Sequence, residues 1–229
     1  MIHTEGFPLG GEPSFDRGGN MKYTHIVFDI DGTLTDTEYA AIVSLQDMVK
    51  HWKGKSYAYD ELKFALGITG ADALHRLGFA DAEIAPAMSE WEIGLRKHNA
   101  EIEVFEGAEA LLSALRERGC ALGIATSKTR DQFDKDFCRF DIARHFGVCI
   151  TADDTTEHKP TAGPLLKYME LTGAKREEML YIGDSEYDSG TAHNADVDFA
   201  LATWGAMNQA VPAQYRPEKL MDVLALIGA

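Results

Sequence analysis

Residues 26–36 read Ile26-Val27-Phe28-Asp29-Ile30-Asp31-Gly32-Thr33-Leu34-Thr35-Asp36. The apolar run at the start predicts a short buried strand, and the polar residues after it predict a loop. Asp29 and Asp31 at the end of a buried strand repel each other unless a cation, a shared proton or deep solvation relieves the charge. We expect a divalent cation with oxygen ligands, and Mg2+ suits a site with few carboxylates and an added phosphate. In the simpler alternative, these Asp residues only cap the loop.

Two neighbouring carboxyl groups can divide the work of a phosphoryl transfer. A carboxylate can attack phosphorus and form an acyl phosphate, which makes Asp29 a candidate nucleophile. A second carboxyl group can donate and accept protons, which makes Asp31 a candidate general acid and base.

The residues that follow form a predicted helical block. Apolar side chains recur at helical spacing from Thr37 to about Trp52, and further helices are expected over 60–66, over 71–77 and from Asp81 onward. We find no convincing strand pattern in this block. It looks like an insertion, and we assign residues 37–104 to an α-helical cap.

From residue 105 onward, predicted helices alternate with strands that are apolar almost throughout. The expected strands are 120–125, 147–150, 179–182 and 197–201, and the expected helices are 108–117, 130–140, 163–172, 189–194 and about 217–226. Such alternation indicates an α/β fold with a doubly wound, Rossmann-like parallel sheet. We assign this core to residues 21–36 and 105–229. Residues 1–20, rich in glycine and polar side chains, are expected to be a disordered leader or extension.

Composition narrows the class of partner. The chain has 229 residues and a net charge of −15, which argues against nucleic acid because phosphate backbones require basic patches. A small anionic substrate stays compatible, since a bound metal and a few local cations decide its binding. No apolar stretch is long enough to span a bilayer, and the three cysteines show no metal-ligand spacing. We expect a cytoplasmic protein without membrane contact, as a monomer or a homodimer.

Polar residues follow each predicted strand of the core. In parallel sheets, ligands bind beyond the carboxyl ends of the strands. The residues there are Asp29 and Asp31, Thr126-Ser127-Lys128, His158-Lys159-Pro160 and Gly183-Asp184-Ser185-Glu186-Tyr187-Asp188. Each has a structural alternative: Thr126 or Ser127 as a helix cap, Lys159 as a solvated surface lysine, Asp184 as a turn residue. The complete set, in order along the chain, favours phosphoryl transfer.

These residues resemble the four motifs of the haloacid-dehalogenase-like hydrolase superfamily. Residues 29–36 are similar to the first motif, and the other three are matched in order by Thr126, by Lys159, and by Gly183-Asp184-Ser185 with Asp188. The inserted helices resemble the superfamily's small helical cap. The resemblance extends from about Met21 to the C-terminus and is greatest for the phosphoglycolate-phosphatase-like branch. Two positions depart from it: Gly163, where the family often has an acid, and Asp196, where glycine is common.

The resemblance implies a role for each motif residue. Asp29 is expected to become the aspartyl phosphate, while Asp31 protonates the leaving alcohol and then activates water. Lys159 is expected to neutralise charge on the nucleophile and on the phosphoryl group, which Thr126 and the Ser127 amide also bind. Mg2+ is expected to be held by Asp29, the main-chain carbonyl of Asp31, Asp184 and, directly or through a neighbouring ligand, Asp188.

Four further features have both a functional and a structural interpretation. Arg76 in the cap would suit an anionic substrate tail. The segment Gly67-Ile68-Thr69-Gly70 is either a specificity loop facing the site or a break between helices. His158 is next to Lys159 and either touches the site or lies at the surface, and Trp204 either lines the entrance or packs in the core.

The sequence therefore predicts a Mg2+-dependent phosphatase that hydrolyses a small phosphorylated metabolite, with a phosphoglycolate-like monoester favoured. A sugar phosphomutase of the same fold is the alternative enzyme, and release of free phosphate separates the two. A dehalogenase is disfavoured, since that chemistry does not use a second acid such as Asp31. A phospho-accepting signalling receiver needs neither the cap nor the 184–188 motif. A non-enzymatic binding protein is the remaining alternative, although no catalytic position is missing.

Overall fold

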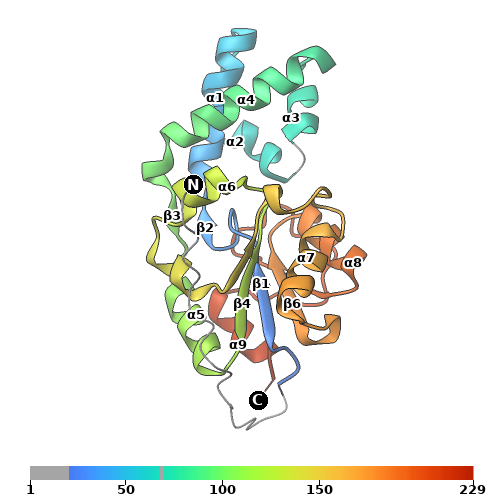
Figure 1. Ribbon diagram of the computed structural model, residues 1–229. Helices are drawn as coiled ribbons and strands as arrows, with labels where there is room; N and C mark the ends of the chain where they lie inside the picture. Colours follow the sequence, from blue (N-terminus) through green and yellow to red (C-terminus); the bar gives the residue numbers. More distant parts are fainter. Residues whose placement is uncertain (1–20, 68–69, 229) are drawn as a thin grey trace, which may run out of the picture.

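The computed structural model describes residues 21–67 and 70–228, and its main feature is a five-stranded parallel sheet (Figure 1). The predicted leader and Ile68-Thr69 lie outside the described residues. The strand order β5-β4-β1-β6-β7 reverses direction at the central strand, and ligands of such sheets bind at this reversal. The strands are β1 (His25–Phe28), β4 (Ala121–Ala125), β5 (Val148–Ile150), β6 (Met179–Gly183) and β7 (Asp198–Leu201).

Helices cover both faces of this sheet, which explains why its strands are apolar almost throughout. Ile26 and Phe28 of β1 pack into one hydrophobic core with α5 (Ala108–Glu117) and α9 (Val223–Leu226). Val27 points the other way, into a second core with α7 (Gly163–Thr172) and α8 (Glu186–Ala195). Figure 1 shows α5 on one side of the sheet and α7 and α8 on the other.

The inserted helices stand together at one end of the molecule (Figure 1) and have a hydrophobic core of their own, which includes Ile42, Leu45, Leu74 and Ala87. The chain enters and leaves them through an antiparallel pair of two-residue strands, β2 (Thr35–Asp36) and β3 (Glu103–Val104). The predicted α/β fold with an inserted α-helical cap is therefore confirmed. The elements of the insertion are α1 (Glu38–Lys53), α2 (Tyr59–Leu62), η1 (Lys63–Gly67), α3 (Gly70–Arg76), α4 (Asp81–Lys97) and η2 (Asn99–Glu101).

Three local predictions were wrong. The block 37–104 contains a strand, β3, which is too short to leave a period-2 pattern in the sequence. The helix expected over 130–140 is one α-helical turn, α6 (Arg130–Gln132), followed by a π-helical turn, η3 (Phe133–Phe137). That wider turn buries Phe133, Asp136 and Phe137 together. The last predicted helix begins later, because a 3-10 turn, η7 (Leu220–Asp222), precedes α9.

Candidate active site

The loop after β1 carries Asp29 and Asp31 in a tight turn. Asp29 is buried, with 8% of its surface exposed, and its amide donates to the Ile182 carbonyl of the neighbouring strand at 2.8 Å. The turn requires glycine at position 32, where φ is +73° and an added Cβ would lie 2.4 Å from Asp184 Oδ2. The loop after β1 and the end of β6 are therefore in direct contact.

The loop after β7 packs against this turn. The Trp204 indole donates to the Thr33 carbonyl at 2.9 Å, and a Cβ built on Gly205 would meet the Gly32 carbonyl oxygen at 1.9 Å. The structural interpretation of Trp204 is thus the one the geometry supports, since its indole fixes the loop through a backbone acceptor.

The end of β6 supplies Asp184 and the buried Asp188. Asp188 lies in the first turn of α8, where its Oδ2 accepts from the Ser185 amide at 3.1 Å and the Ser185 hydroxyl at 2.5 Å. The Ser185 side chain in turn accepts from the Asp188 amide at 3.3 Å, which closes a capping box at the helix start. The Tyr181 hydroxyl lies 2.8 Å from Asp188 Oδ1 and 2.9 Å from the Ala125 carbonyl. This network holds Asp188 in one orientation.

Lys159 joins the two strand ends through its ammonium group. Its Nζ lies 2.8 Å from Asp29 Oδ1 and 2.6 Å from Asp188 Oδ1, and only 4% of its side chain is exposed. Burial alone would lower the pKa of Lys159, but the two carboxylates outweigh burial and raise it, so the side chain stays charged. The same pairing holds the pKa of Asp188 below its usual range, although burial opposes the shift.

When all three are ionised, Asp29, Asp184 and Asp188 carry three negative charges, of which Lys159 balances one. Burial raises the pKa of Asp29 to about 7, with Lys159 opposing and the neighbouring carboxylates adding to the shift. Burial and the charges of Asp188 and Asp29 raise the pKa of Asp184 well above its usual value. The Asp184 side chain accepts a long, weak hydrogen bond from the Thr33 hydroxyl, at 3.4 Å.

These carboxylates fit a hard divalent cation. Asp29, Asp184 and Asp188 each offer an oxygen, and the three oxygens lie within 4.8 Å of one another. Carboxylate oxygens are the ligands that Mg2+ prefers, and a cation would offset the burial and the carboxylate repulsion that together raise the pKa of Asp184. Among the described residues, no other group of three acidic, histidine or cysteine side chains forms such a cluster.

The loop after β4 adds Thr126, Ser127 and Lys128. Thr126 is buried, and its hydroxyl oxygen accepts from the Lys128 amide at 3.3 Å, which leaves the hydroxyl proton available for donation. The cap of the next helix is Thr129, whose side chain accepts from the Gln132 amide. The alternative in which Thr126 or Ser127 caps that helix is therefore wrong. Lys128 pairs with Asp31, since its Nζ lies 2.9 Å from Asp31 Oδ2.

The structure does not bring every candidate residue into this group. Arg76 is exposed at the end of α3, and its guanidinium lies over the Phe64 ring, 4.2 Å from the centroid. His158 is exposed, whereas Lys159 beside it points inward. Two side chains of the site, Lys128 and Tyr181, were not assigned a role from the sequence. The sequence features that could have pointed to them are a lysine directly after the Thr-Ser pair and a single hydroxyl-bearing residue in the apolar strand β6.

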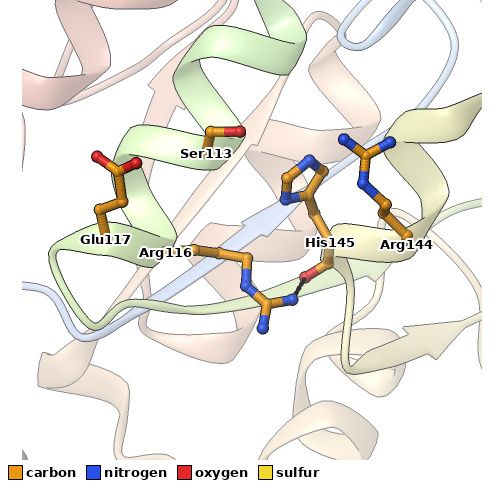
Figure 2. A pocket seen from close by; sticks show the side chains of 5 residues that line it. All are labelled: Ser113, Arg116, Glu117, Arg144 and His145. Atoms are coloured by element: carbon orange, nitrogen blue, oxygen red, sulfur yellow. Dashed lines mark hydrogen bonds between the residues drawn. The ribbon is translucent and has the colours of Figure 1, made fainter.

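A surface pocket lies away from this edge of the sheet. It has a volume of about 330 Å³ and is lined by Ser113, Arg116, Glu117, Arg144 and His145 (Figure 2). Its cations are already engaged: Arg144 pairs with Glu109 at 2.6 Å, and Arg116 donates to the His145 carbonyl at 3.1 Å. Arg116 and His145 lie just before β4 and β5, so this pocket is at the amino ends of the strands, opposite the carboxylates.

The chain belongs to the haloacid dehalogenase-like hydrolase family, whose model it matches over residues 26–202. The predicted family and the predicted enzyme class, a hydrolase, are confirmed. The pyrophosphatase PpaX of Halalkalibacterium halodurans is 30% identical, over 91% of this chain and 98% of that protein.

Solved structures agree with this assignment. A crystal structure from Lactobacillus plantarum, of a protein provisionally named a phosphoglycolate phosphatase, is 31% identical with a TM-score of 0.82 and covers 90% of this chain and 100% of that one. A subfamily IA hydrolase of Geobacter sulfurreducens is 25% identical with a TM-score of 0.71, over 92% of this chain and 99% of that one. Within residues 21–67 and 70–228, none of the helices has the length and apolar character needed to cross a bilayer.

Proposed function

We propose that this hydrolase is a Mg2+-dependent phosphatase that acts on a small phosphorylated metabolite through an aspartyl-phosphate intermediate. The observation that carries the proposal is Asp29, a buried carboxylate with Lys159 on one oxygen and two further carboxylates beside it. This arrangement offers a nucleophile, a fixed positive charge and a cation site at one edge of the sheet. The names of the relatives, pyrophosphatase and phosphoglycolate phosphatase, support the same reaction class.

In the first half of the reaction, an Asp29 oxygen attacks phosphorus and the bond from phosphorus to the leaving oxygen breaks. Asp31, in its protonated form, gives its proton to that leaving oxygen. Lys159 and the donors at Thr126 and Ser127 hold the phosphoryl oxygens, because phosphoryl transfer depends mostly on positioning and positive charge.

In the second half, Asp31 is a carboxylate and takes a proton from water. The water oxygen attacks phosphorus, the bond to Asp29 breaks, and inorganic phosphate leaves. The Asp29 carboxylate is regenerated next to Lys159, whose two ion pairs keep it oriented for the next turnover.

Mg2+ would be held by the carboxylates of Asp29, Asp184 and Asp188 and by the main-chain carbonyl of Asp31, and it would supply positive charge opposite the phosphoryl oxygens. We expect Ca2+ to bind with little turnover, since it takes more ligands in a looser geometry that displaces the nucleophile.

The substrate we favour is a phosphoglycolate-like monoester, with pyrophosphate as the second candidate because a 30% identical relative carries that name. Residues 37–104 are the proposed cap that closes over the site and sets specificity. Arg76 remains the proposed contact for an anionic substrate tail, a role that requires its guanidinium to leave the Phe64 ring.

A phosphate-release screen tests the proposal. Purified protein is given phosphoglycolate, pyrophosphate, nucleoside monophosphates and sugar phosphates, with Mg2+, Ca2+ or excess chelator, and Asp29→Asn serves as the inactive control. We expect free phosphate only with Mg2+ and only from the unsubstituted enzyme. Isomerised sugar phosphate without free phosphate would identify a phosphomutase instead. Full activity in excess chelator would contradict the metal assignment.

A further inference from the structure

Lys128 is a buried cation without a role in the reaction described above. Only 10% of its side chain is exposed, and its Nζ lies 2.9 Å from Asp31 Oδ2 and 3.8 Å from Asp136 Oδ2. Taking an ammonium group out of water is costly, so such a lysine persists only where its partners are well placed. Both partners are carboxylates, and one of them is the proposed proton donor.

The second partner, Asp136, is fixed by its surroundings. It comes from the π-helical turn η3 and is buried, with 7% of its side chain exposed. Its Oδ1 accepts from the Asn99 side-chain amide at 2.6 Å. Asn99 belongs to η2, the 3-10 turn that links the last cap helix to β3. The contacts therefore run without interruption from the cap linker through Asp136 and Lys128 to Asp31.

The backbone of Lys128 is also held by hydrogen bonds. Its carbonyl accepts from the Ala152 amide at 2.8 Å, and its amide donates to the Thr126 hydroxyl at 3.3 Å. Asp31, in contrast, has 37% of its side chain exposed. Within residues 21–67 and 70–228, the side chain that pairs with the Asp31 carboxylate is Lys128. Without Lys128, rotation of the Asp31 side chain would meet little resistance.

We propose that Lys128 is a positioning residue that holds the Asp31 carboxylate in place for proton transfer, and that Asp136 and Asn99 tie this ion pair to the cap linker. The inference rests on the proposed phosphatase function. Proton transfer requires hydrogen-bond distance to the leaving oxygen, and a displacement of about 1 Å can cost on the order of 100-fold in rate. Lys128 acts through Asp31 and does not itself touch the reacting atoms.

The test compares leaving groups. An alkyl phosphate needs a proton on its departing oxygen, whereas p-nitrophenyl phosphate releases a stable anion and needs little help. For Lys128→Met we expect kcat/KM to fall by about 10- to 100-fold with the alkyl phosphate and much less with the activated ester. The ratio kcat/KM is the right quantity, because it reports the steps up to the first irreversible bond cleavage. Lys128→Arg should restore part of the loss, and Asp136→Asn should give a smaller loss with the same selectivity.

Controls separate this role from a general loss of structure. Lys135→Met removes a lysine from the same segment that is 65% exposed and pairs with Asp131, and it should leave both substrates unaffected. Since Lys128→Met leaves Asp136 buried without its cation, the double variant Lys128→Met/Asp136→Asn is measured beside it, with melting curves for all proteins. The double variant is expected to show the same leaving-group selectivity.

Two results would overturn different statements. Equal falls for both leaving groups, in Lys128→Met and in the double variant, would overturn the positioning role alone. Failure of the unsubstituted enzyme to release phosphate from either ester with Mg2+ would overturn the proposed function, and this inference with it.

Discussion

Asp184→Asn is expected to stabilise the metal-free protein while removing its response to Mg2+. The carboxylate oxygens of Asp29, Asp184 and Asp188 lie within 4.8 Å of one another. Two unit charges at that separation repel by about 3 kcal/mol at an effective dielectric constant of about 20. Asp184 faces two such charges, and Lys159 offsets one of them, which leaves a net repulsion of about 3 kcal/mol.

An amide of the same shape carries no charge and can still accept from the Thr33 hydroxyl. The substitution should therefore raise the free energy of unfolding in chelator by about 2–4 kcal/mol. For a domain of this size, each kcal/mol shifts the melting temperature by roughly 2–4 °C, so we expect a rise of about 10 °C. The unsubstituted protein should gain a similar amount from saturating Mg2+, since about 2.7 kcal/mol follows from a ligand at 100 times its Kd.

The assay is thermal unfolding in chelator and in Mg2+, with Asp47→Asn as the matched control. Asp47 is exposed on α1, and its substitution should change the melting temperature by little. A lower melting temperature for Asp184→Asn than for the unsubstituted protein in chelator would refute the reasoning. An equal Mg2+ response in both proteins would refute the assignment of Asp184 as a ligand.

The pH dependence has a definite sign. The folded pKa of Asp184 is raised, so above its unfolded value of 3.8 the folded state binds more protons than the unfolded one. Stability then falls as pH rises through that range, and Asp29, with a folded pKa of about 7, acts in the same direction. The stability advantage of Asp184→Asn in chelator should therefore be smaller at pH 5 than at pH 7.5. An advantage that does not change with pH would contradict the raised pKa.

Three further substitutions have clear expectations. Asp29→Asn should abolish phosphate release with an unchanged circular dichroism spectrum, because an amide does not attack phosphorus, and retained turnover in a clean preparation would refute the assignment of the nucleophile. Asp31→Asn should slow poor leaving groups more than good ones, by about 10²–10⁴-fold for the poor ones, and an equal loss would argue against proton transfer. Gly205→Ala should destabilise the protein by about 1–3 kcal/mol in urea unfolding, because its Cβ would lie 1.9 Å from the Gly32 carbonyl oxygen. Gly147→Ala, where the nearest atom is 4.0 Å away, is the control.

The sheet and the grouping of the motif residues were predictable because few physical rules determine them. Parallel strands deliver their carboxyl ends to one edge, so the residues after β1, β4 and β6 had to meet there. The departure at Asp196 also has a local explanation. Its φ of +56° at the end of α8 is left-handed, which glycine adopts at no cost and Asp tolerates. The departure at Gly163 has a steric explanation, since the Cβ of an acidic residue there would lie 2.6 Å from the Glu157 carbonyl oxygen.

The contacts of Lys128 were not predictable in the same way. They depend on the π-helical turn η3, and helical periodicity in the sequence cannot distinguish a π turn from a continued α-helix. A regular helix over 130–140 would also place Asp136 on the face of Phe133 and Phe140, but spacing along the chain does not reveal that its buried partner is Lys128. The orientation of Arg76 was equally out of reach, because a stacking contact with Phe64 depends on the packing of the cap helices and not on spacing along the chain.

The two candidate catalytic residues, Asp29 and Asp31, are each paired with a different lysine. Lys159 lies between Asp29 and Asp188, and Lys128 lies between Asp31 and Asp136. Each lysine thus pairs with one candidate catalytic residue and with one buried carboxylate that holds the lysine in place. The nucleophile Asp29 must keep its negative charge, whereas the general acid and base Asp31 must gain and lose a proton. Because each is paired with its own lysine, the surroundings of the two carboxyl groups can differ. Neither lysine pairs with Asp184, and the local excess of negative charge around it, more than the net charge of the chain, is what favours a bound cation.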